Sequence, residues 1–141
     1  MAKKIMVVDD EAGIRKLLFD VLSGQGFKVT LAKDGMDSLL QMKNRCFDLL
    51  ITDMNMPRLD GIGLLKTMKK EGRKERIIIM TGESFDQGRH KKDIPPVFTR
   101  LRKPFHVNQF LEVVSSALST AGGKKRPAGS TRRQKGALHA V

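Results

Sequence analysis

The chain has 141 residues, about 40% of them apolar, so it can bury the core of one compact domain. Its net charge is +12, and its single cysteine excludes an intramolecular disulfide. No apolar run approaches the roughly 18 residues that a membrane-spanning helix needs, and the N-terminus lacks the apolar stretch of a secretory signal. We therefore expect a cytoplasmic protein with no membrane partner.

The first part of the chain predicts a strand, a helix and a second strand. Residues 4–8 form a short apolar run that ends at acids, which is typical of a buried strand. Apolar side chains then recur every three or four positions over residues 14–22, as on one face of a helix. Residues 27–31 can form the next strand.

A second helix and a third strand follow. After an Asp-Gly turn, Met36, Leu39 and Leu40 predict the start of an apolar helical face. Residues 49–52 predict another buried strand. We expect Cys46, which precedes that strand, to be a small buried residue.

The last part of the chain predicts the remaining elements. Residues 64–68 indicate a third helix, and residues 77–80 a fourth strand. The segment 82–96 contains glycine and a pair of prolines, which limit any helix there to about two turns. Residues 98–102 can form a fifth strand, and residues 107–118 predict a final helix.

This alternation predicts an α/β fold in which a doubly wound, five-stranded parallel sheet is covered by helices on both faces. The strands look continuously apolar, as buried parallel strands should. Residues 122–141 carry six lysines and arginines, no acid and no apolar periodicity. We expect a domain over residues 1–121 and a disordered basic tail over residues 122–141.

Polar side chains stand where four of the predicted strands end. The first strand is followed by Asp9 and Asp10, the third by Asp53, the fourth by Thr81 and the fifth by Lys103. Ligands of an open parallel sheet bind outside the carboxyl ends of its strands. These side chains are therefore candidates for one shared site.

The charges of these residues predict a bound cation. Three carboxylates in one crevice repel each other, whereas Lys103 together with a divalent cation would balance them. Hard oxygen ligands favour Mg²⁺, which often binds one or two carboxylates together with a phosphate. One carboxylate can then accept a phosphoryl group, while the cation, Lys103 and the Thr81 hydroxyl offset charge on its oxygens.

Four segments at these strand ends resemble the receiver domain of two-component response regulators, of the single-domain chemotaxis and sporulation type. They are Ile5-Met6-Val7-Val8-Asp9-Asp10-Glu11, Asp53-Met54-Asn55-Met56-Pro57, Met80-Thr81-Gly82 and Lys103-Pro104-Phe105. The resemblance covers roughly residues 3–120. It implies a flavodoxin-like (β/α)5 fold with strand order 2-1-3-4-5.

The resemblance also implies a role for each site residue. Asp53 would be the phosphoryl acceptor. Asp10, Asp53 and the backbone carbonyl of Asn55 would bind Mg²⁺ directly, and Asp9 would act mainly through a metal-bound water. Thr81 would donate a hydrogen bond to the phosphoryl group.

Lys103 would contact a phosphoryl oxygen and would form a cis peptide bond with Pro104. One position departs from the family pattern, because Arg100 stands where receivers usually carry a Tyr or Phe that turns inward on activation. Burying an unpaired guanidinium is costly, so we expect Arg100 to point outward and to help form a partner surface. Phe98 has the same strand parity as Arg100 but lies further from the site.

These expectations describe a stand-alone receiver that is phosphorylated by a sensor histidine kinase or a phosphotransfer protein. It would switch the face made by its fourth helix (85–93), fifth strand and last helix for an unknown downstream protein. The residues after the last helix leave no room for a DNA-binding domain. The protein would not be an enzyme, except that it catalyses its own phosphorylation and dephosphorylation.

Two alternatives remain at this point. The basic tail could bind the phosphates of a nucleic acid without sequence preference. The acids could instead belong to a small Mg²⁺-dependent phosphohydrolase. Enzymes of the haloacid-dehalogenase type need a second Asp two residues after the nucleophile, and here that residue is Asn55.

Overall fold

Five short strands form one parallel sheet in this computed structural model, which describes residues 2–82 and 87–119. In chain order the elements are β1 (Lys4–Val8), α1 (Ala12–Gly24), β2 (Lys28–Ala32), α2 (Gly35–Met42), β3 (Leu49–Asp53), α3 (Gly61–Lys70), β4 (Arg76–Thr81), the 3-10 helix η1 (Gln87–His90), β5 (Thr99–Arg102) and α4 (Val107–Ser119). Across the sheet the order is β2-β1-β3-β4-β5, which confirms the implied topology. The expected tail, residues 122–141, lies outside the described residues.

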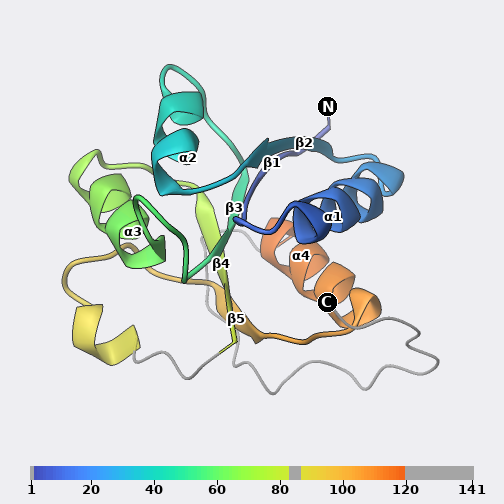
Figure 1. Cartoon of the computed structure of the whole chain (residues 1–141). Coiled ribbons are helices and arrows are strands. Elements are labelled where there is room, and N and C mark those ends of the chain that lie inside the picture. The colour runs from blue at the N-terminus through green and yellow to red at the C-terminus, as the bar shows by residue number, and fades with distance from the viewer. Residues whose placement is uncertain (1, 83–86, 120–141) are drawn as a thin grey trace.

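Helices cover both faces of the sheet: Figure 1 shows α1 and α4 on one face and α2 and α3 on the other. Alternate side chains of each central strand enter the two cores. In β1, Ile5 and Val7 pack with α1 and α4, whereas Met6 and Val8 pack with α2 and α3. Because both faces are covered, β1, β3 and β4 are buried along almost their whole length.

The two edge strands are less buried. β2 is half-buried over most of its length, and β5 alternates between buried Thr99 and Leu101 and exposed Arg100 and Arg102. The expectation of a continuously apolar strand is therefore wrong for β5, although the outward position of Arg100 is confirmed. Phe98 precedes β5 and is buried in the core beside α1 and α4, so its expected parity with Arg100 is wrong.

The apolar face predicted for α2 is wrong for Met36 and Leu40 but correct for Leu39, which packs against the core between α2 and α3. Leu40 is 61% exposed and Met36 is 43% exposed, whereas Ser38 and Met42 face the core. Cys46 is exposed as well. In the segment before β3 the buried side chain is the next one, Phe47.

The expected fourth helix is reduced to one short turn, η1, in the described part of that segment. Residues 83–86, at its beginning, lie outside the described residues. Within the described ranges, no helix combines the length and the apolar character that crossing a bilayer requires.

Candidate metal and phosphoryl-transfer site

Four strands place polar side chains at the same edge of the sheet. Asp9 follows β1, Asp53 ends β3, Thr81 ends β4 and Lys103 follows β5. Asp9 is fully buried, and Asp53 and Thr81 are each only 5% exposed. Asp10 is exposed, so the site opens to solvent on its side.

The parallel register brings the carboxylates together. Val8 of β1 is the partner of Thr52 of β3, so the residues that follow them, Asp9 and Asp53, emerge side by side. Asp9, Asp10 and Asp53 each offer a carboxylate oxygen, and these oxygens lie within 4.8 Å of one another. The structure therefore brings the three predicted acids into one cluster.

Lys103 lies against this acidic cluster. Its Nζ is 2.9 Å from Oδ2 of Asp9, 3.6 Å from Oδ2 of Asp53 and 3.8 Å from Oε1 of Glu11. Its backbone N–H donates to the carbonyl oxygen of Thr81 at 2.7 Å. The peptide bond between Lys103 and Pro104 is cis, as the resemblance implied.

The positive charge near Asp53 does not offset the effects that disfavour its ionised form. Burial raises the pKa of Asp53, and the negative charge of Asp9 raises it further, against an opposing effect of Lys103. Burial alone would lower the pKa of Lys103, but its hydrogen bond to Asp9 and the neighbouring carboxylates raise it overall. One ammonium group therefore stays charged but does not by itself remove the cost of ionising Asp53.

The donor set fits a hard divalent cation. All three clustered ligands are carboxylates, the type that Mg²⁺ prefers, and the exposed side of Asp10 leaves room for the waters that Mg²⁺ keeps. Asn55 is also exposed and lies beside Asp53, since its N–H is 3.4 Å from Oδ1 of Asp53. This contact places the backbone of Asn55 next to the acidic cluster.

Comparison with known proteins identifies a family with this arrangement of residues. Residues 5–115 match the response regulator receiver domain family. The chain belongs to this family. Receiver domains are signalling modules of two-component systems. They interact with histidine kinases or phosphotransfer proteins and bind Mg²⁺ at an acidic pocket.

Two relatives and one solved structure define the similarity further. The receiver is 36% identical over 120 residues to sporulation initiation phosphotransferase F of Bacillus subtilis, covering 84% of this chain and 95% of that protein. It is 31% identical over 123 residues to the DNA-binding transcriptional regulator NtrC of Salmonella typhimurium, covering 87% of this chain but only 26% of the relative. A receiver domain protein from Clostridium thermocellum superposes with a TM-score of 0.71 at 31% identity, over 84% of this chain and 94% of that chain.

Two residues at the site of this receiver were not anticipated from the sequence. Glu11 contacts Lys103, and its N–H donates to Oδ1 of Asp9 at 2.9 Å. Arg15 donates from Nη1 to the carbonyl oxygen of Asp9 at 2.7 Å. Their positions in the sequence could have indicated both residues, because Glu11 extends the acidic run and Arg15 follows one helical turn later.

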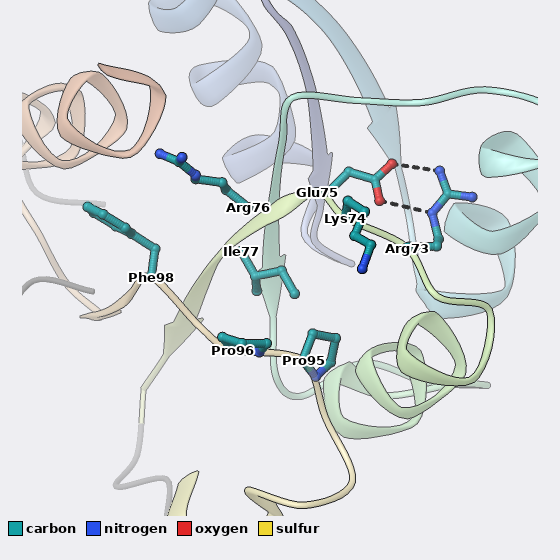
Figure 2. Close-up of a pocket in the computed structure, with 8 residues that line it drawn as sticks. All are labelled: Arg73, Lys74, Glu75, Arg76, Ile77, Pro95, Pro96 and Phe98. Atoms are coloured by element: carbon teal, nitrogen blue, oxygen red, sulfur yellow. Dashed lines mark hydrogen bonds and ion pairs between the residues drawn. The ribbon is translucent and has the colours of Figure 1, made fainter. Parts of the chain in front are cut away.

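A separate cavity of about 470 Å³ lies at the opposite, amino-terminal end of β4. Figure 2 shows its lining, in which Ile77, Pro95 and Pro96 accompany the bidentate ion pair of Arg73 with Glu75. Glu75 is the one acid among the residues that line this cavity, and its carboxylate is already paired. We therefore assign the candidate chemistry to the acidic cluster and not to this cavity.

Proposed function

We propose that this receiver accepts a phosphoryl group on Asp53 from a sensor histidine kinase or a phosphotransfer protein, with Mg²⁺ as the required cation. Asp10, Asp53 and the carbonyl of Asn55 would bind the cation, and Asp9 would act mainly through a metal-bound water. The observation that carries the proposal is the meeting of a nearly buried carboxylate, Asp53, with two further carboxylates and a charged lysine at one sheet edge.

The chemistry follows from the positions of these groups. A carboxylate oxygen of Asp53 attacks the phosphorus of a phosphohistidine, a P–O bond forms as the P–N bond breaks, and the freed electron pair remains on the imidazole nitrogen. Mg²⁺ would neutralise charge on the transferring oxygens. Lys103 offsets the charge on Asp53 and then on a phosphoryl oxygen, and the Thr81 hydroxyl donates to another. Asp9 holds the lysine in position through their hydrogen bond.

The output would be a protein contact. The chain covers almost the whole of the sporulation phosphotransferase. This similarity supports the proposal that the receiver acts through contacts of its own surface or by passing its phosphoryl group to another protein. We assign the switching surface to η1, β5 and α4, where Arg100 is exposed on β5. Such a surface suits a partner that presents acidic side chains.

The surface proposal is tested with Arg100→Ala. We expect weaker binding of the downstream protein in at least one phosphorylation state, measured by titration calorimetry, while Lys16→Ala on α1 leaves binding unchanged. Unchanged binding of the Arg100 variant in both states would remove Arg100 from the interface.

Incubation with Mg²⁺ and acetyl phosphate tests the central proposal. We expect intact-protein mass spectrometry to show one added phosphoryl group, which is lost with Asp53→Asn or with a chelator. Asp20→Asn on α1 is the matched control, because Asp20 is an exposed acid paired with Lys16 and should leave the labelling intact. Absence of the adduct on the wild-type protein, or its persistence in the Asp53 variant, would contradict the proposal. Sustained hydrolysis of generic phosphate esters would favour the phosphohydrolase alternative.

A further inference from the structure

The loop between β3 and α3, residues 54–60, carries Asn55 and is mostly exposed. Backbone hydrogen bonds hold its two ends, since Met54 N–H donates to the carbonyl oxygen of Met80 and Gly61 N–H donates to that of Met54. Asn55 lies between these fixed ends. Its N–H side is held, because it donates to Oδ1 of Asp53 at 3.4 Å, so contacts further along the loop can restrict the direction of its carbonyl.

Arg58 occupies the middle of the loop in an unusual backbone conformation. Its φ is +65°, in the left-handed region that disfavours residues with a Cβ atom. Its guanidinium contacts Asp34 at two points, with Nε 2.8 Å from Oδ2 and Nη2 3.1 Å from Oδ1. A strained conformation persists where the surrounding contacts determine it, and this bidentate pair is such a contact.

Asp34 is well placed to hold the loop. It is only 3% exposed, and its Oδ1 accepts the N–H of Asp37 at 2.8 Å as the N-cap of α2. The hydrogen bond from Arg58 is the largest cause of its lowered pKa, so the carboxylate is charged at neutral pH. The ion pair therefore connects the loop to a fixed point at the start of α2.

A second contact joins the same two segments. Gly35 N–H donates to the carbonyl oxygen of Leu59 at 3.0 Å. A Cβ atom at Gly35 would lie 2.4 Å from that oxygen, so the loop rests directly on the first turn of α2. Two neighbouring loop residues, Arg58 and Leu59, are thus bonded to the two residues at the start of α2, Asp34 and Gly35.

We propose that the ion pair between Asp34 and Arg58, the loop clamp, positions the backbone carbonyl of Asn55 for the divalent cation. Asp34 and Arg58 are then positioning residues of the metal site that act through Asn55 without contacting the cation. Only two residues separate Asn55 from Arg58, so fixing Arg58 restricts the orientation of that carbonyl. The inference rests on the proposed function, because it assumes that the acidic cluster binds Mg²⁺.

Two conservative variants separate positioning from folding. Arg58→Gly removes the ion pair and supplies a residue that adopts positive φ without strain. Asp34→Asn removes the charge and keeps a side chain that caps helices as well as Asp does. Neither variant is therefore expected to lower the stability of the metal-free protein enough to unfold it, which urea denaturation with a chelator checks.

Mg²⁺ affinity is then measured by titration calorimetry on the full chain. Loss of a group bonded directly to a metal ligand typically weakens binding by about 10–100-fold. Because Asp34 and Arg58 act through the loop backbone, we expect each single variant to weaken binding by about tenfold, the lower end of this range. The double variant should bind no more weakly than the weaker single one, because both changes remove the same contact. Lys16→Ala, which breaks an exposed ion pair on α1, should leave the affinity unchanged.

Wild-type affinity in both single variants, or a double variant whose loss is the product of the two single losses, would overturn the clamp. Failure of the wild-type protein itself to bind Mg²⁺ is a different result. It would overturn the proposed function of the acidic cluster, and the clamp with it.

Discussion

Asp53 illustrates, at the scale of one residue, how this fold holds an acid in an unfavourable state. Its pKa in the folded protein lies above the ordinary carboxyl value, chiefly because of burial and then because of Asp9. A raised pKa stabilises the fold only below the ordinary value, and this contribution is lost as pH rises through the folded value. At neutral pH the ionised carboxylate therefore destabilises the metal-free protein.

Because ionised Asp53 destabilises the metal-free fold, removing its charge with Asp53→Asn should raise stability. We expect the variant to unfold at a higher temperature than the wild-type protein at neutral pH with a chelator present. The difference should shrink as pH falls through the folded value and should approach zero only well below the ordinary carboxyl value of about 4, where the wild-type carboxyl is protonated in both states. Calorimetric melting curves across this range check it. A variant that is less stable at neutral pH would contradict the prediction.

Gly61 is a second residue whose identity the site requires. A Cβ atom there would lie 2.7 Å from the carbonyl oxygen of Asp53 and 2.8 Å from Cα of Met54. We expect Gly61→Ala to lower the free energy of unfolding by about 1–3 kcal/mol, because the backbone next to Asp53 must move. Urea denaturation measures the change.

The matched control is Gly13→Ala in α1, where nothing lies within 4 Å of the added atom. Alanine is the better helix former, so this control should gain up to about 1 kcal/mol. Equal stability of the two variants would show that the backbone of the site yields more easily than its geometry indicates.

At the scale of secondary-structure elements, the ion pair between half-buried Arg73 and the buried carboxylate of Glu75 joins three segments at the end of the sheet opposite the acidic cluster. Arg73 donates to both carboxylate oxygens of Glu75, at 3.0 and 2.6 Å. It also donates to the carbonyl oxygens of Met42, at the end of α2, and Arg45. Glu75 in turn accepts the N–H of Phe47 at 3.1 Å. The start of β4 is thereby fixed to the segment that leads into β3.

Glu75→Ala should therefore be strongly destabilising. It leaves the charge of Arg73 and the N–H of Phe47 without their partner, and we expect the free energy of unfolding to fall by about 3 kcal/mol. Chemical denaturation measures this loss. Lys16→Ala, which breaks a pair whose side chains are 79% and 58% exposed, should change stability by less than about 0.5 kcal/mol. A similarly small loss for Glu75→Ala would contradict the proposed structural role of the pair.

The elements also show how far local sequence patterns predict this fold. The alternation of strands and helices follows local periodicity, and the sequence predicts it correctly except between β4 and β5, where the described residues form only η1. The buried face of α2 was predicted correctly only for Leu39. The first turn of this helix lies close to Leu59, and a contact between segments distant in sequence cannot be read from local periodicity. β5 differs from the expectation because it is an edge strand, and a periodicity argument does not reveal which strand lies at the edge.

The candidate site, too, was predicted from the sequence only in part. Asp9, Asp53 and Lys103 were predicted to meet because parallel strands end at one edge, and the structure brings them together. The pair of Asp34 and Arg58 was not predicted. It joins two loops 24 residues apart, and no helical or strand repeat relates their positions.

At the scale of the whole molecule, binding and folding are linked. A cation that binds only the folded receiver stabilises it by about 2.7 kcal/mol at one hundred times its dissociation constant. We expect Mg²⁺ to raise the temperature of unfolding, and Asp10→Asn to lose most of that rise. Because Asp10 is exposed, the variant should match the wild-type protein in a chelator. Asp20→Asn should retain the full rise, and an undiminished rise in the Asp10 variant would exclude Asp10 as a ligand.

The alternation of β5 has a consequence for how copies of this protein meet. β5 is an outer strand of the sheet, and outer strands can pair with those of another molecule. Its exposed side chains, Arg100 and Arg102, are both cationic. Two molecules aligned along this strand would bring guanidinium groups together, so their mutual repulsion opposes the growth of a continuous sheet from molecule to molecule.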